Sequence, residues 1–145
     1  MDVLILERDE LVAEIVVDVL ENDGLTAAIM RTDHAAKTAY FPEAPRVVVT
    51  SINRCGEDLK GMETARELRS RWRSLAIIYL AALWPARLHR QALSTRERFL
   101  PKPVSIDRLT DAVRDLLRTD IGSNWRKGRF SRRSIYFPTL KLVRH

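Results

Sequence analysis

Short runs of apolar residues alternate along the first 118 positions with segments whose apolar residues recur at helical spacing. The runs that predict strands buried on both faces are 3–6, 26–30, 47–52, 75–80 and 99–100. The segments that predict helices are 10–23, 34–40, 62–72, 87–93 and 106–117. Because each strand is followed by a helix, we expect an α/β domain of the doubly wound (βα)5 type, with a five-stranded parallel sheet between helices.

The first and last of these helices have clear boundary signals. Asp9 and Ser105 are N-cap residue types, and Gly24 is typical of a helix C-terminus. The stripes that we expect to face the core are Leu11, Ile15, Val16, Val19 and Leu20 in the first helix, and Leu109, Ala112, Val113, Leu116 and Leu117 in the last.

The composition is that of one globular domain. The chain has 145 residues, of which 46% are hydrophobic and 30% charged. Cys55 is the single cysteine, so no intrachain disulfide can form. The sequence has neither a run approaching the roughly 20 apolar residues of a membrane span nor the basic start of a signal peptide. We therefore expect a cytoplasmic protein without a membrane partner.

The net charge of +6 is concentrated at the C-terminus. Residues 119–145 contain seven Lys and Arg residues against Asp120 alone, and residues 1–118 are electrically balanced. The sequence thus divides into a folded domain over 1–118 and a basic tail over 119–145.

In open parallel sheets, ligand chemistry lies beyond the carboxyl ends of the strands. The residues that follow these ends here are Glu7, Arg8 and Asp9 after the first strand, Ser51 in the third, Ala81 after the fourth and Lys102 after the fifth.

At these places the sequence resembles the bacterial response-regulator receiver (CheY-like) family. The resemblance spans about residues 2–118 and is carried by 3–12, 48–53 with Gly56, 60–63, 77–82 and 99–103. In that family two carboxylates after the first strand hold Mg²⁺ beside an aspartate that accepts phosphate at the end of the third strand. A hydroxyl residue ending the fourth strand and a lysine ending the fifth contact the phosphoryl group. The resemblance implies a flavodoxin-like fold and a role in two-component (phosphorelay) signalling.

The chain departs from this pattern where the chemistry takes place. Arg8 stands at the second carboxylate position, Ser51 at the phosphoacceptor position and Ala81 at the position of the switch hydroxyl. In the following loop, Cys55 replaces the family proline. The positions that match the family are Glu7, Lys102 and the aromatic switch residue Phe99. The sequence therefore predicts a degenerate pseudo-receiver.

The substitutions remove the groups on which metal binding and phosphorylation depend. Mg²⁺ prefers carboxylate oxygens, and only Glu7 and Asp9 remain as weak candidate ligands. Ser51 cannot form an acyl phosphate, and no acid–base pair or nucleophile set indicates an enzyme. We expect no catalytic residue, metal or other cofactor. For Arg8 two interpretations are open: it and Lys102 pair with the carboxylates and fix the site in one state, or Arg8 points into solvent.

We therefore expect a module that binds a protein of a signalling pathway without phosphorylation. The candidate partners are a histidine kinase, a phosphotransfer protein, a target protein or a second copy of the chain, and the expected surface spans 81–117. The alternative is a receiver that accepts phosphate on a non-standard aspartate, Asp9 or Asp58. Trp84 is either an exposed contact residue or part of ordinary packing.

The tail interleaves basic and aromatic residues over 125–137, a composition that can bind phosphate backbones and stack on bases. We favour a free tail, or one that docks on a neighbouring subunit, over nucleic-acid binding. His34, His89 and His145 share no metal-ligand spacing and are not expected to form a site.

Overall fold

The computed structural model of the chain describes residues 1–31, 35–36, 40–52, 59–84 and 93–118. Its strands form one sheet with the order β2-β1-β3-β4-β5, and every neighbouring pair is parallel. The strands are β1 (Val3–Leu6), β2 (Ala27–Met30), β3 (Val47–Ser51), β4 (Ala76–Ala81) and β5 (Glu97–Pro101). The predicted α/β fold with a five-stranded parallel sheet is confirmed.

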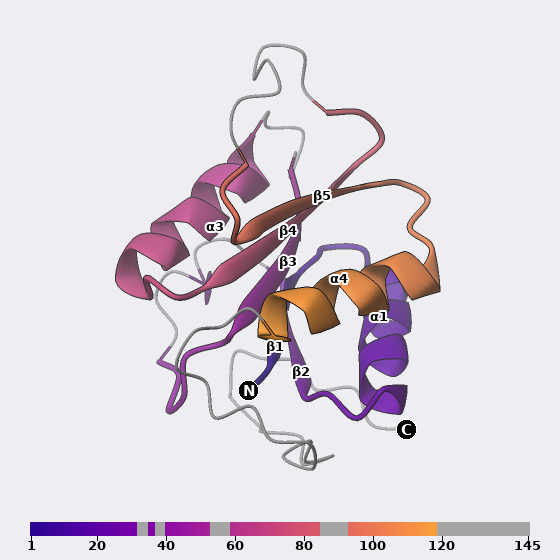
Figure 1. Cartoon of the computed structure of the whole chain (residues 1–145), viewed down its shortest axis with the longest axis horizontal. Helices are drawn as coiled ribbons and strands as arrows, with labels where there is room; N and C mark the ends of the chain where they lie inside the picture. The colour runs from indigo at the N-terminus through magenta and orange to yellow at the C-terminus, as the bar shows by residue number, and fades with distance from the viewer. Residues whose placement is uncertain (32–34, 37–39, 53–58, 85–92, 119–145) are drawn as a thin grey trace.

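Helices cover both faces of this sheet (Figure 1). Helices α1 (Glu10–Asn22) and α4 (Ile106–Arg118) lie on one face, and α3 (Lys60–Arg71) lies on the other. Of the helix predicted over 34–40, the described residues Ala35 and Ala36 are helical, whereas Tyr40 lies outside any helix. Most of the helix predicted over 87–93 falls on residues outside the described ranges.

Strand residues alternate between two hydrophobic cores because successive side chains of a strand point to opposite faces. Ile5 and Ile78 face α1 and α4, whereas Leu4 and Ile77 face α3. All four are almost completely buried. This double burial explains why the strands read as continuous apolar runs.

The residues that α4 buries agree with the prediction, but the prediction for α1 is partly wrong. Leu109, Ala112, Val113, Leu116 and Leu117 are all buried, as expected. In α1, the structure buries Ala13, Val16, Val17 and Leu20 and leaves Leu11 and Ile15 exposed at 67% and 49%. The helix has apolar residues on two faces, so the periodicity did not determine which face meets the sheet.

The predicted helix boundaries are confirmed at three places. The Asp9 side chain accepts a 3.2 Å hydrogen bond from the amide of Val12, and Ser105 caps α4 in the same way through the amide of Arg108. Gly24, with φ 84°, follows the C-terminus of α1. Among the described residues, no helix is both long and apolar enough to cross a bilayer.

Candidate functional site

Three side chains from three strand ends meet at the carboxyl edge of the sheet. The Ser51 hydroxyl, at the end of β3, donates a 3.1 Å hydrogen bond to Oε2 of Glu7. Nζ of Lys102, which follows β5, donates a 3.0 Å hydrogen bond to Oγ of Ser51. The three residues therefore form a continuous chain in which a buried hydroxyl separates an ammonium group from a carboxylate. We call these residues the Glu7–Ser51–Lys102 chain.

The second oxygen of Glu7 is occupied by the backbone. Oε1 accepts hydrogen bonds of 2.9 and 3.0 Å from the amides of Arg8 and Asp9. These bonds hold the turn between β1 and α1. The Arg8 side chain itself is exposed, which agrees with the second interpretation of this residue. Asp9 is also exposed, and its carboxylate serves as the N-cap of α1.

A close approach of α3 fixes the backbone beneath Ser51. The amide of Gly61 donates a 2.9 Å hydrogen bond to the carbonyl of Ile52. A Cβ added at Gly61 would lie 1.7 Å from the carbonyl oxygen of Ser51. Only glycine permits this packing, so Gly61 sets the distance between α3 and the end of β3.

Ala81 and Phe99, the residues at the positions that the resemblance identifies as switch positions, lie on adjacent strands, at and near the same edge of the sheet. Ala81 ends β4 and carries no hydroxyl, and its carbonyl accepts a 2.9 Å hydrogen bond from the amide of Lys102. Phe99 in β5 is half-buried and packs edge-on against Trp84, with ring centroids 5.3 Å apart. Trp84 is also half-buried, so this contact favours packing over an exposed contact role.

The donor set of this edge provides a poor fit for Mg²⁺. Magnesium requires near-octahedral oxygen ligands, usually including one or two carboxylates. Both oxygens of Glu7 already accept hydrogen bonds, and Asp9 caps a helix. The Lys102 ammonium, which is joined to Glu7 through the Ser51 hydroxyl, also brings a positive charge close to this carboxylate. Among the described residues, no three His, Cys, Asp or Glu side chains are grouped as a metal site.

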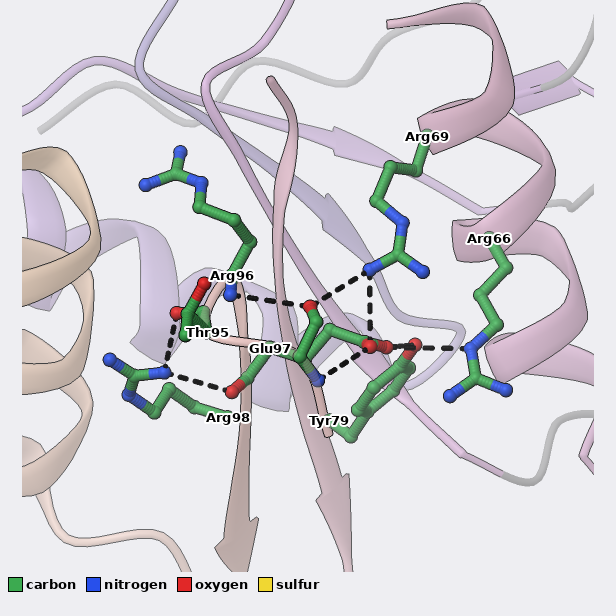
Figure 2. Close-up of polar contacts among 8 residues, drawn as sticks. Arg66, Arg69, Tyr79, Thr95, Arg96, Glu97 and Arg98 are labelled. Carbon is green, nitrogen blue, oxygen red and sulfur yellow. Dashed lines mark hydrogen bonds and ion pairs between the residues drawn. The ribbon is translucent and has the colours of Figure 1, made fainter. Parts of the chain in front are cut away.

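A second polar cluster, which we did not predict from the sequence, lies at the N-terminal end of β5, away from the carboxyl edge of the sheet (Figure 2). The Glu97 carboxylate is buried and accepts a 2.5 Å hydrogen bond from the Tyr79 hydroxyl. Two arginines of α3 point toward it: Arg69 lies 3.1 Å from Oε1 and Arg66 lies 3.4 Å from Oε2. The amide of Ser94 also donates to Oε1 at 3.2 Å. We call these residues the Glu97 cluster.

Hydrogen bonding and charge in this cluster keep Glu97 ionised. Burial alone would raise the pKa of the carboxyl group, but the hydrogen bonds from Tyr79, Ser94 and Arg69 outweigh it and lower the pKa from 4.5 to about 2. Burial, followed by the hydrogen bond and charge of Glu97, raises the pKa of Tyr79. A carboxylate with so low a pKa is a poor proton acceptor at neutral pH, so the cluster is suited to joining α3, β4 and β5.

Sequence signals for this cluster exist but are weak. Arg66 and Arg69 lie on one face of a helix, at i and i+3, and Tyr79 interrupts an aliphatic strand. No local pattern pairs them with Glu97. Several other predictions fall on residues outside the described ranges, namely those for His34, Cys55, Gly56, Asp58, His89 and the tail 119–145 with His145.

No protein-family model and no curated protein matches the sequence. Similar solved structures include the receiver domain of a Francisella response regulator, with 23% identity and a TM-score of 0.67 over 81% of this chain and 96% of that chain. The receiver domain of NtrX from Brucella abortus has 22% identity and a TM-score of 0.67 over 81% and 99%. The signal receiver domain of a modulated diguanylate cyclase from Desulfovibrio desulfuricans has 24% identity and a TM-score of 0.68 over 82% and 94%. The sheet order of this chain, its layers of helices and these matches together show that it has the fold of response-regulator receiver domains.

Proposed function

We propose that this chain is a pseudo-receiver of two-component signalling, which acts by binding a protein partner and accepts no phosphoryl group. The observation that carries the proposal is the Glu7–Ser51–Lys102 chain. At the place where a receiver needs a free carboxylate nucleophile, a serine hydroxyl is hydrogen-bonded on both sides.

The charges of the site support a single resting state. Phosphoryl transfer to a carboxylate depends on a metal that neutralises the incoming charge. Here Lys102 reaches the Ser51 hydroxyl directly, and that hydroxyl reaches Glu7. The ammonium and carboxylate thereby balance each other without a divalent ion, and we propose that the site works without Mg²⁺.

The absence of a switch hydroxyl supports the same proposal. A hydroxyl residue that ends β4 could bond to a phosphoryl group and move toward it. Ala81 has no atom that could do so, and Phe99 already packs against Trp84. β4 therefore lacks the hydroxyl side chain that could respond to phosphorylation and change the partner surface.

The proposed partner is a protein of the same class of pathway: a histidine kinase, a phosphotransfer protein or a target. We place its contact on the surface formed by 81–117. Leu83 and Ile106, which are 82% and 57% exposed, are apolar side chains of that surface. Phosphate acceptance on Asp9 is not favoured because this residue caps α1.

The test is to incubate the purified chain with Mg²⁺ and acetyl phosphate and to record its intact mass. We expect no phosphoryl adduct beside an active receiver as control. A hydroxylamine-labile adduct on the unmodified chain would mean that a carboxylate still accepts phosphate, and the proposal would then be wrong.

A reconstruction of the site makes the test sharper. The triple variant Arg8→Asp, Ser51→Asp, Ala81→Thr restores the groups that the proposal holds to be missing. We expect it to gain a hydroxylamine-labile phosphoryl adduct in the presence of Mg²⁺. The matched control is Arg8→Asp, Ser51→Asn, Ala81→Thr, which has the same shape but no carboxylate nucleophile and should remain unmodified.

A further inference from the structure

The outward face of α1 combines exposed apolar residues with acidic ones. Leu11, Val12 and Ile15 are exposed at 67%, 37% and 49%, and their spacing places them on neighbouring positions of one helix surface. The helix carries four acidic residues and no basic one, and one of the four, Glu10, pairs with Arg31 at 2.9 Å. Few exposed helices of a monomeric domain leave such large aliphatic side chains together in water. We call Leu11, Val12 and Ile15 the α1 face.

The α1 face lies near the Glu7–Ser51–Lys102 chain. It belongs to the N-terminal half of α1, which begins directly after the Glu7 turn. A segment bound there would therefore lie beside the carboxyl edge of the sheet, where receivers carry their chemistry.

The composition of residues 119–145 complements this face in both charge and apolarity. The segment contains seven Lys and Arg residues and one acidic residue, together with Trp125, Phe130 and the run 135–137. Basic residues are attracted to an acidic helix surface, and aromatic residues can cover exposed aliphatic ones.

The segment begins close enough to reach the α1 face. Residue 118 ends α4, and Arg114 of α4 pairs with Asp23 at the C-terminus of α1. Helix α1 has 13 residues and is therefore about 20 Å long. Trp125 follows Arg118 by seven positions, which allows a span of up to about 23 Å.

We propose that the basic, aromatic segment 119–145 binds the apolar α1 face and the acidic residues of the same helix in its own chain. Attachment through α4 gives the segment a high effective concentration at its own helix, which favours the same chain over a second copy. The bound segment covers Leu11, Val12 and Ile15 and thereby restricts access of other proteins to this side of the site.

The first test is a photo-crosslinking experiment on the full-length chain. Ile15 is replaced by p-benzoylphenylalanine, the protein is irradiated as a mixture of isotope-labelled and unlabelled chains, and the crosslinked peptides are identified by mass spectrometry. We expect crosslinks from position 15 to residues 119–145 within one chain. The same probe at the exposed position Leu83 is the control and should give a lower yield with this segment.

Other crosslinking results would overturn the proposal. Crosslinks between labelled and unlabelled chains would assign the α1 face to a second copy. Crosslinks confined to residues 1–118 would show that the tail does not bind it, and the face would then be open to a separate protein partner.

Limited trypsin digestion provides an independent measurement, because the segment contains most of its cleavage sites around 126–133. In the full-length double variant Leu11→Ser, Ile15→Ser, we expect the initial cleavage rate within 119–145 to rise roughly tenfold, since cleavage follows the released population. Tyr40→Ser, which removes a 78% exposed side chain outside both α1 and the surface 81–117, should leave the rate unchanged. An unchanged rate in the double variant, with a circular dichroism spectrum like that of the original chain, would contradict the proposal.

Discussion

The hydroxyl of Tyr79 donates a 2.5 Å hydrogen bond to the carboxylate of Glu97 and so links β4 to the edge strand β5 through side chains as well as backbone. Arg66 and Arg69 bring α3 into the same contact (Figure 2). A buried charge is tolerated only where its hydrogen-bonding capacity is used, and Glu97 meets that condition from three elements. The Glu97 cluster is thus a structural centre away from the carboxyl edge of the sheet.

The first prediction concerns the coupling between Tyr79 and Glu97. Tyr79→Phe and Glu97→Gln should each lower the free energy of unfolding by roughly 1–3 kcal/mol, because each leaves a buried polar partner less satisfied. The double variant should lose less than the sum of the two, by about 1 kcal/mol. Urea denaturation of the four chains measures this cycle.

Glu63→Gln is the control for this cycle, because it neutralises an exposed carboxylate on the same helix α3. It should change the free energy of unfolding by less than about 0.5 kcal/mol. Strict additivity of the Tyr79 and Glu97 variants would show that their hydrogen bond contributes nothing to stability.

The second prediction follows from the low pKa of Glu97. Its folded-state value of about 2 lies below the ordinary 4.5, so the folded state binds the proton less readily than the unfolded state. The stabilisation is therefore complete above about pH 4.5 and is lost as the pH falls toward 2. Across that window, the difference in unfolding free energy between the original chain and Glu97→Gln should shrink by roughly 2–3 kcal/mol.

The comparison with Glu97→Gln removes the contribution of the other carboxylates, which titrate in both proteins. Urea denaturation at a series of pH values from 2.5 to 7 would measure it. A difference that stays constant over this range would mean that Glu97 titrates alike in both states, contrary to the geometry of the cluster.

The third prediction concerns alkaline pH. The pKa of Tyr79 is raised by burial and by Glu97, so above about pH 10 the unfolded chain loses this proton before the folded chain does. The free energy of unfolding should consequently fall as the pH rises beyond 10, and it should fall less in Tyr79→Phe. Parallel curves for the two proteins would show that Tyr79 ionises freely in the folded state.

The fourth prediction concerns Gly61, whose position allows α3 to contact the end of β3. Gly61→Ala would place Cβ 1.7 Å from the Ser51 carbonyl oxygen, so the helix or the strand must move. We expect a loss of about 3 kcal/mol in stability from this overpacking. Ser70→Ala, at an exposed position of the same helix, should change stability by less than about 0.5 kcal/mol.

The sequence allowed the carboxyl-edge site to be anticipated because strand ends in a parallel sheet necessarily converge. Once the strands were located, Glu7, Ser51 and Lys102 had to lie near one another, and hydrogen bonds join them. The Glu97 cluster could not be anticipated in this way. Its contact with Arg66 spans 31 positions and depends on the side of the sheet on which α3 packs.

The buried face of α4 could be predicted from the sequence and that of α1 could not, and the reason is again tertiary packing. In α4 the apolar residues form one stripe between charged residues, so the buried face was predictable. In α1 apolar residues occupy most positions and form two candidate stripes. Only packing against the sheet distinguishes them, and it buries the stripe that contains Leu20 and leaves out Leu11.

The last prediction tests this assignment with the same substitution at two positions of α1. Leu20 is fully buried, so Leu20→Ala should lower the free energy of unfolding by roughly 2–5 kcal/mol through lost burial and a residual cavity. Leu11 is 67% exposed, so Leu11→Ala should cost less than about 1 kcal/mol even where it weakens a bound tail. Both changes keep a good helix former, so helix propensity cancels in the comparison. Urea denaturation of both variants in the full-length chain measures the two costs, and a cost for Leu11→Ala that equals or exceeds the cost for Leu20→Ala would contradict this assignment.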